Sequence, residues 1–109
     1  MLGENAAISI LNIILEKAAE LPPSSELRAV YLTILHRLFH AVPRIFYETE
    51  GEEQRERRSK ICDVMEAILD MSAENPDMNR TAVLRTKVIL NDQSSYFEGF
   101  DDPLDFPGT

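Results

Sequence analysis

The sequence has few of the residues that hold a small protein together without a hydrophobic core. Among 109 residues there are one cysteine, two histidines, four glycines and no tryptophan. The single Cys62 excludes an intrachain disulfide, and one cysteine with two histidines cannot close a structural zinc site of four Cys and His ligands. A chain of this length should bury roughly two thirds of its unfolded surface as one domain. We therefore expect a single domain held by an apolar core, with no cofactor.

The chain also lacks a long apolar run and an excess of bases. The longest uncharged segment near the N-terminus, Asn5 to Leu15, is too short to span a bilayer and follows Glu4 instead of a basic region. Nineteen acids against 11 bases give a net charge of −8, which disfavours direct binding to nucleic acid or to anionic lipid. We expect a cytoplasmic protein with neither nucleic acid nor membrane as a direct partner.

Charge alternates along the chain. Residues 24–44 and 76–91 each carry a net charge of +2, whereas residues 45–75 and 92–109 each carry −5. An acidic surface can compete with an acidic polymer for a basic partner.

The segment Asn5 to Leu21 is predicted to be a helix with a very wide apolar arc. At 100° per residue its polar positions fall within one stripe of about 80°, and Lys17 is the one charge outside that stripe. A surface helix needs an apolar arc of only about 100°. This helix should therefore be surrounded, either as the central helix of a bundle or beneath a second chain.

A second helix is predicted from Glu26 to Val42. Pro22 and Pro23 end the first helix, and Ser24 or Ser25 can cap the next one. The proline that follows Val42 removes an amide hydrogen, so residues 44–47 should form only a short continuation.

A third helix is predicted from Gly51 to Ala73. Thr49 and Glu52 match a capping box, and Glu53 and Arg57 have the favourable i, i+4 spacing for an ion pair. Residues 48–60 contain no apolar side chain, so the first half of this helix should project past the core into solvent.

The segment of residues 76–91 is ambiguous between helix and strand. Asn75, Pro76 and Asp77 form a helix start signal, but many of the residues that follow are β-branched. We favour a helix, because a lone strand would need a second chain to pair with. The fold class is then all-α: a small bundle of three long helices plus a shorter fourth, with an irregular acidic C-terminal tail.

The tail, residues 92–109, mixes acidic and aromatic side chains. It could act as a linear motif that docks Tyr96, Phe97 and Phe100 on a basic partner. We favour the alternative in which Phe97, Phe100 and Phe106 cap the open end of the core, so that the tail packs on a helical domain of residues 1–91.

His36 and His40 are the strongest candidate ligands, because their i, i+4 spacing places both imidazoles on one helical face. The pattern lacks the glutamate of an HExxH motif and a third histidine, and Arg37 and Arg44 would repel a cation. We favour a solvated or partner-facing cationic stripe, with a metal-binding helical protein as the alternative.

No catalytic constellation is visible. Cys62 lies one turn after Arg58, but a lone thiol on an amphipathic helix is usually inert. The sequence contains neither a glycine-rich phosphate loop nor a nucleophile elbow. We expect no enzymatic activity. Neighbouring acids offset a basic cluster that could otherwise attract nucleic acid: Arg55, Arg57, Arg58 and Lys60.

The predicted helices carry more apolar surface than four helices can hide, which indicates an interaction surface. Self-association as a twofold homodimer is the simplest way to cover it. The residues assigned to this partner or dimer interface are Ile8, Leu11, Ile14, Leu15, Leu32, Leu35 and Phe39.

These features favour a non-enzymatic regulatory protein that acts by protein–protein binding. One form is an antagonist that sequesters a transcriptional regulator by covering its dimerisation or DNA-binding surface. The alternative is a small acidic chaperone for secretion or assembly, which would hold an apolar segment of a client.

Overall fold

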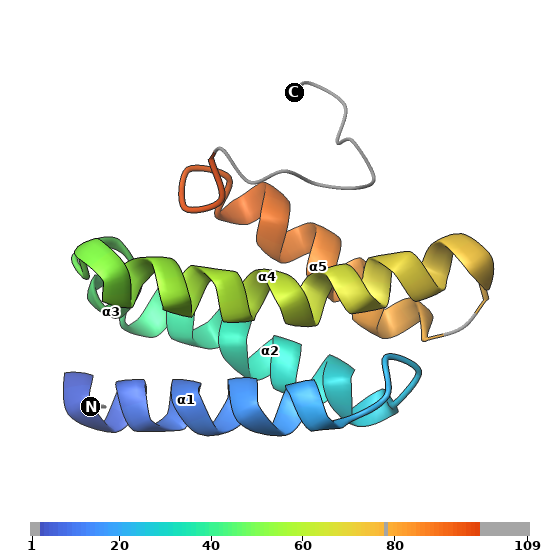
Figure 1. Ribbon diagram of the computed structural model, residues 1–109, viewed down its shortest axis with the longest axis horizontal. Coiled ribbons are helices and arrows are strands. Elements are labelled where there is room, and N and C mark those ends of the chain that lie inside the picture. The colour runs from blue at the N-terminus through green and yellow to red at the C-terminus, as the bar shows by residue number, and fades with distance from the viewer. Residues whose placement is uncertain (1–2, 78, 99–109) are drawn as a thin grey trace.

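The protein is all-α, as the sequence predicts. A computed structural model describes residues 3–77 and 79–98, and these form α1 (Glu4–Glu20), α2 (Glu26–Ala41), α3 (Arg44–Tyr47), α4 (Gly51–Glu74) and α5 (Arg80–Asp92) (Figure 1). The three long helices, the shorter fourth and the brief continuation after Pro43 are therefore confirmed. The segment that was ambiguous between helix and strand is helical.

The helices alternate in direction across the bundle. Figure 1 shows α1 and α4 running one way and α2 and α5 running the other. The α2 helix packs against both α1 and α5, and α4 covers α1 and α5 from the other side. The α2 and α5 helices are far apart in the sequence but pack together in parallel (Figure 1). This brings together the two cationic segments of the chain, residues 24–44 and 76–91.

One apolar cluster fills the space between the helices, and every helix contributes to it. The rings of Phe39 and Phe46 stack with centroids 3.7 Å apart, and Tyr96 meets both of them edge-on. One side of α1 is buried, including Leu11, while Ile13 on its outer side is exposed. The α1 helix is therefore an outer helix of the bundle.

Local signals explain where α2 begins. The Ser25 hydroxyl accepts a hydrogen bond from the Leu27 amide at 3.2 Å, which confirms the predicted cap. Arg28 in the next turn is buried: it donates to the Leu21 carbonyl at 2.6 and 3.1 Å and to the Val64 carbonyl at 3.0 Å. Burial lowers the pKa of its guanidinium. This side chain joins the end of α1, the start of α2 and the middle of α4.

The first half of α4 does not project past the core, which corrects the prediction from its polar sequence. Arg57 is buried, and its guanidinium donates to the Ile45 carbonyl at 2.8 Å and to Glu53 at 2.9 Å. The long stem of arginine can lie on apolar surface while its head satisfies polar atoms. The predicted capping box is also wrong, because Thr49 donates to the Ile45 carbonyl and Glu50 occupies the N-cap position.

The start of α5 lies four residues later than its start signal predicts. Residues 75–77 form a turn, and Asn79 precedes the helix with a left-handed backbone (φ 50°). Its side-chain amide donates to the Pro23 carbonyl at 2.7 Å and to the Ser25 carbonyl at 3.0 Å. Asparagine tolerates this backbone conformation, so these contacts tie the start of α5 to the start of α2.

Candidate functional site

Two histidines of α2 and one aspartate of α5 converge at the surface. Nε2 of His36 lies 3.0 Å from Oδ2 of Asp92, and Nε2 of His40 lies 2.7 Å from the same oxygen. The two Nε2 atoms are 3.2 Å apart. The exposed fraction of the side chain is 16% for His36, 60% for His40 and 39% for Asp92. The cluster is therefore open to solvent on the His40 side.

The proton of the His36 ring can be placed from its neighbours. Nδ1 of His36 lies 3.2 Å from Nη1 of Arg85. A guanidinium can only donate, so Nδ1 accepts this hydrogen bond, and the ring proton is on Nε2, where it faces Asp92. Since Nε2 of His40 also donates to Asp92, one carboxylate oxygen receives two N–H groups that face each other.

These hydrogen bonds stabilise the ionised form of Asp92. Its pKa is lowered from the usual value chiefly by the hydrogen bond with His36, with smaller contributions from Gln93 and His40. The imidazole rings of the two histidines meet edge to face, with centroids 4.9 Å apart.

The sequence identifies the histidine pair but misses Asp92. A pattern of three histidines does not include Asp92, because this third group is a carboxylate that lies 52 residues after His40. The spacing within α2 gives the first two positions. The third needs the knowledge that the C-terminal ends of α2 and α5 lie together.

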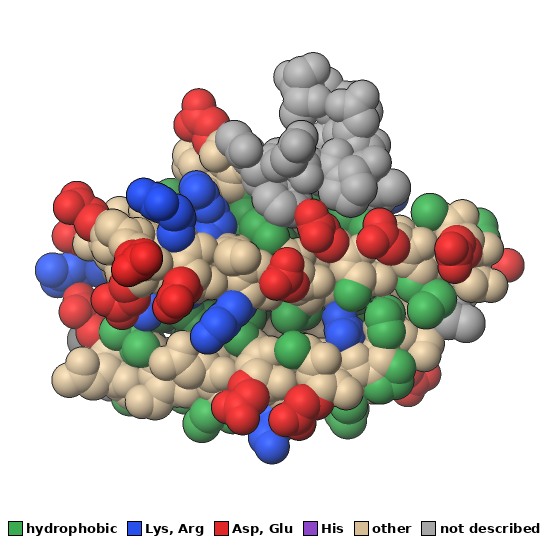
Figure 2. All heavy atoms as spheres, in the orientation of Figure 1, with side chains coloured by type: hydrophobic (Ala, Val, Ile, Leu, Met, Phe, Trp, Pro, Cys, Tyr) green, Lys and Arg blue, Asp and Glu red, His purple; other side chains and the backbone are tan. Residues whose placement is uncertain are grey.

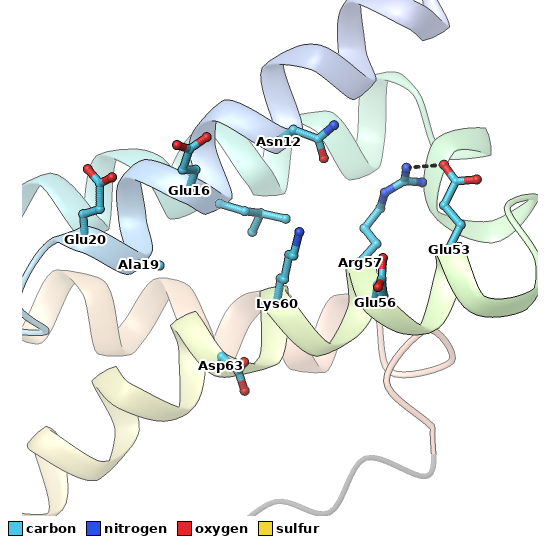
Figure 3. A pocket seen from close by; sticks show the side chains of 10 residues that line it. Asn12, Glu16, Ala19, Glu20, Glu53, Glu56, Arg57, Lys60 and Asp63 are labelled. Atoms are coloured by element: carbon cyan, nitrogen blue, oxygen red, sulfur yellow. Dashed lines mark hydrogen bonds and ion pairs between the residues drawn. The ribbon is translucent and has the colours of Figure 1, made fainter.

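A second feature is an acidic groove between α1 and α4. Its volume is about 580 Å³, and Figure 3 shows acidic side chains of both helices around it. Lys60 extends from α4 toward α1 between them, while Arg57 is engaged with Glu53 (Figure 3). Figure 2 also shows acidic side chains spread over α4 and α1 on this face. The carboxylates of the groove belong to Glu16, Glu20, Glu53, Glu56 and Asp63.

The residues predicted to form a partner or dimer interface do not form an exposed surface, and their assignment is corrected. Ile8 is half-buried, and the remaining six side chains lie in the chain's own core because the neighbouring helices cover them. Helical periodicity locates an apolar face but does not show what covers it. The six buried residues are Leu11, Ile14, Leu15, Leu32, Leu35 and Phe39.

Exposed apolar side chains do occur, at other positions. On α2, Leu27 and Val30 are 53% and 51% exposed, and Tyr31 and Ile34 beside them are half-buried. Their spacing of i, i+3, i+4 and i+7 places them on one face of the helix. We call these four residues the α2 stripe. Other exposed apolar residues are Ile13 on α1 and Leu84 and Val88 on α5.

The aromatic residues of the tail divide between the described and the undescribed parts of the chain. Tyr96 and Phe97 are buried against the core, so their rings cover the end of the bundle and cannot serve as the exposed motif considered from the sequence. Phe100 and Phe106 lie outside the described residues.

The Cys62 thiol has the properties of a structural group. It is buried, and burial raises its pKa to about 12, with a smaller contribution from Glu66. The thiolate, which is the reactive form, is therefore suppressed at neutral pH.

Comparisons with known proteins give no relative: no protein family, no curated protein and no solved structure matches the chain. Within residues 3–77 and 79–98, none of the helices combines the length and the apolar composition that crossing a membrane requires.

Proposed function

We propose that this protein is a non-enzymatic regulator that acts by binding a basic surface of another protein. The acidic groove between α1 and α4 carries the proposal. Five carboxylates surround it, while the base that extends into it is Lys60 and the second base, Arg57, is paired with Glu53. Such a groove attracts lysine and arginine side chains and speeds the approach of a basic partner.

The partner we propose is a transcriptional regulator. A surface that binds DNA is rich in lysine and arginine, because these residues neutralise phosphates. A protein with an acidic groove could cover such a surface and keep it from DNA. The protein would then act as an antagonist, through occupancy of the surface and without a chemical step.

The proposal is tested by charge reversal in the groove. Partners are first identified by affinity capture from the native host, and the association of each purified partner is then measured by surface plasmon resonance. The double variant E16K/E56K should associate at least tenfold more slowly, and the effect should shrink as salt is raised. The matched control is D70K/E74K, which reverses two exposed acids of α4 outside the groove.

Three outcomes separate the alternatives. Displacement of the captured regulator from its DNA by the natural protein, but not by E16K/E56K, supports the antagonist. Equal slowing by D70K/E74K and E16K/E56K would show that net charge and not the groove is recognised. Binding to unfolded clients in preference to a folded partner would replace the antagonist with the chaperone.

A further inference from the structure

The cluster of His36, His40 and Asp92 brings three potential ligand atoms close together at the surface. Both imidazoles direct Nε2 at one oxygen of Asp92, at 3.0 and 2.7 Å, and the two Nε2 atoms approach to 3.2 Å. With the proton of each ring on Nε2, two donors face each other across that short distance. We propose that the cluster binds one divalent transition-metal ion, for which Zn²⁺ is the probe.

The spacing of the three atoms fits an ion. Ligand atoms about 2.1 Å from Zn²⁺ are about 3.4 Å apart at the tetrahedral angle of most zinc sites and about 3.0 Å apart at the right angles of a six-coordinate site. The observed separations of 2.7, 3.0 and 3.2 Å lie around the value for right angles. A circle through the three atoms has a radius of about 1.7 Å, so a point about 2.1 Å from each atom exists just off their plane.

The ligand types select the class of ion. Two imidazoles and one carboxylate suit zinc, nickel, copper or iron, whereas magnesium and calcium require oxygen ligands. The α2 and α5 side chains would occupy three positions, and the exposed side of His40 leaves room for water at the others. Binding displaces the proton from each Nε2 atom and replaces two opposed donors with two bonds to the ion.

Positive charge near the cluster is smaller than the sequence suggests. Nε of Arg44 lies 2.8 Å from Glu48 and 3.3 Å from Glu4, so its charge is offset. Arg37 follows His36 directly and therefore points about 100° away around α2. Arg85 opposes an ion directly, because its Nη1 lies 3.2 Å from Nδ1 of His36.

Arg85 is expected to weaken the site. When Nε2 of His36 binds an ion, its ring proton moves to Nδ1, where it meets the guanidinium of Arg85, another donor. A glutamine at position 85 could instead accept that proton, as the second partner of a metal-bound histidine usually does. R85Q should therefore bind the ion more tightly than the natural protein.

A bound ion would join the C-terminal ends of α2 and α5. The turn that follows α5 delivers Tyr96 and Phe97 to the core, so the ion would also hold this turn in place. This inference is independent of the proposed partner, because the cluster lies on α2 and α5 and the acidic groove lies between α1 and α4.

The test is calorimetric titration of tag-free protein with Zn²⁺ at pH 7.5, together with thermal unfolding followed by circular dichroism. We expect one ion per chain and a rise in Tm of about 5 °C when free Zn²⁺ exceeds the Kd tenfold. Mg²⁺ at the same concentration should leave Tm unchanged. H40A and D92N should each weaken binding at least tenfold, and both change solvent-accessible side chains, so they should fold.

Each variant can overturn the site. Absence of heat and of any Tm change with 100 μM Zn²⁺ would refute it. Equal affinity in the natural protein and in H40A or D92N would place the ion elsewhere on the chain. R85Q should bind at least threefold more tightly, whereas weaker binding by a folded R85Q would refute the assignment of Nε2 of His36 as a ligand.

Discussion

The guanidinium of Arg28 in α2 donates to the backbone carbonyl of Val64 in α4, 36 residues away, at 3.0 Å. The same side chain also binds the Leu21 carbonyl twice. Charged donors contribute more than neutral ones, and their loss removes both side-chain donors from the Leu21 carbonyl at the end of α1. Arg28 is thus a polar link between the end of α1, the start of α2 and α4.

Replacement of Arg28 should destabilise the fold strongly. R28M keeps the apolar stem and removes the three hydrogen bonds, so we expect the free energy of unfolding to fall by about 3 kcal/mol. Urea denaturation followed by circular dichroism measures this change. The matched control R55M alters an exposed arginine of α4 and should change stability by less than about 0.5 kcal/mol. Similar losses in both variants would contradict the role of Arg28.

The hydroxyl of Tyr96 is predicted to contribute nothing to stability. It is buried, and no donor or acceptor among the described residues lies within hydrogen-bond distance of it. Burial also raises the pKa of Tyr96 to about 12. Y96F should therefore leave stability unchanged or raise it by up to about 1 kcal/mol, because it removes a polar group that is buried without a partner.

Tyr47 provides the matched comparison. Its hydroxyl donates to Oε1 of Gln93 at 2.6 Å, so Y47F should lose about 0.5–1 kcal/mol in the same assay. A loss in Y96F larger than that in Y47F would show that the Tyr96 hydroxyl has a partner in solution.

Local signals in the sequence predict the helices well. Apolar periodicity and the Ser25 cap act within a few residues, so the start of α2 and the helical state of α5 follow from them. The failures come from acceptors that compete for the capping side chains. Thr49 binds the Ile45 carbonyl instead of capping α4, and Asn79 binds the α1–α2 loop and delays α5. The Ile45 carbonyl lies only four residues before Thr49, whereas the sequence carries no local trace of the acceptor that Asn79 binds.

The candidate site shows the same division between local and distant information. The pair His36 and His40 is visible because a helix repeats every 3.6 residues. Asp92 joins them only because α2 and α5 lie side by side, which no spacing encodes. The interface prediction is wrong for the same reason. Helical periodicity correctly places Leu11 and Leu35 on apolar faces, but the neighbouring helices cover those faces, which form the core.

Stability should fall at alkaline pH because of Cys62. Its thiol has a pKa of about 12 in the folded protein, against an ordinary value of 9.0. Above pH 9 the unfolded chain therefore releases this proton while the folded chain keeps it. The unfolded state then binds fewer protons, so the free energy of unfolding decreases as pH rises, with a slope of up to roughly 1.4 kcal/mol per pH unit from this group.

The variant C62A isolates this contribution. Urea midpoints of the natural protein and C62A are compared between pH 8 and pH 10. The natural protein should lose more stability over that range than C62A, even though C62A starts lower because of the missing thiol. Parallel pH profiles would show that the thiol ionises normally in the folded state.

The α2 stripe predicts how two copies would associate. Glu26 and Arg37 are exposed residues with opposite charges at the two ends of the stripe, and their spacing of eleven residues, about three turns, places both along the same edge. If two α2 helices pack antiparallel across a twofold axis, each Arg37 meets the partner's Glu26. The charges that flank the stripe are therefore complementary in this antiparallel arrangement.

Light scattering of the natural protein at 50 μM should then give twice the chain mass of 12.4 kDa. The variant L27E should be monomeric, because it places a charge in the apolar contact. L84E, which changes an exposed leucine of α5 outside the stripe, should remain dimeric. E26R should weaken the dimer roughly tenfold, since it opposes two pairs of like charges. The double swap E26R/R37E restores both pairs and should recover the dimer. A monomeric natural chain would refute self-association, and a dimer that the double swap fails to restore would refute the antiparallel register.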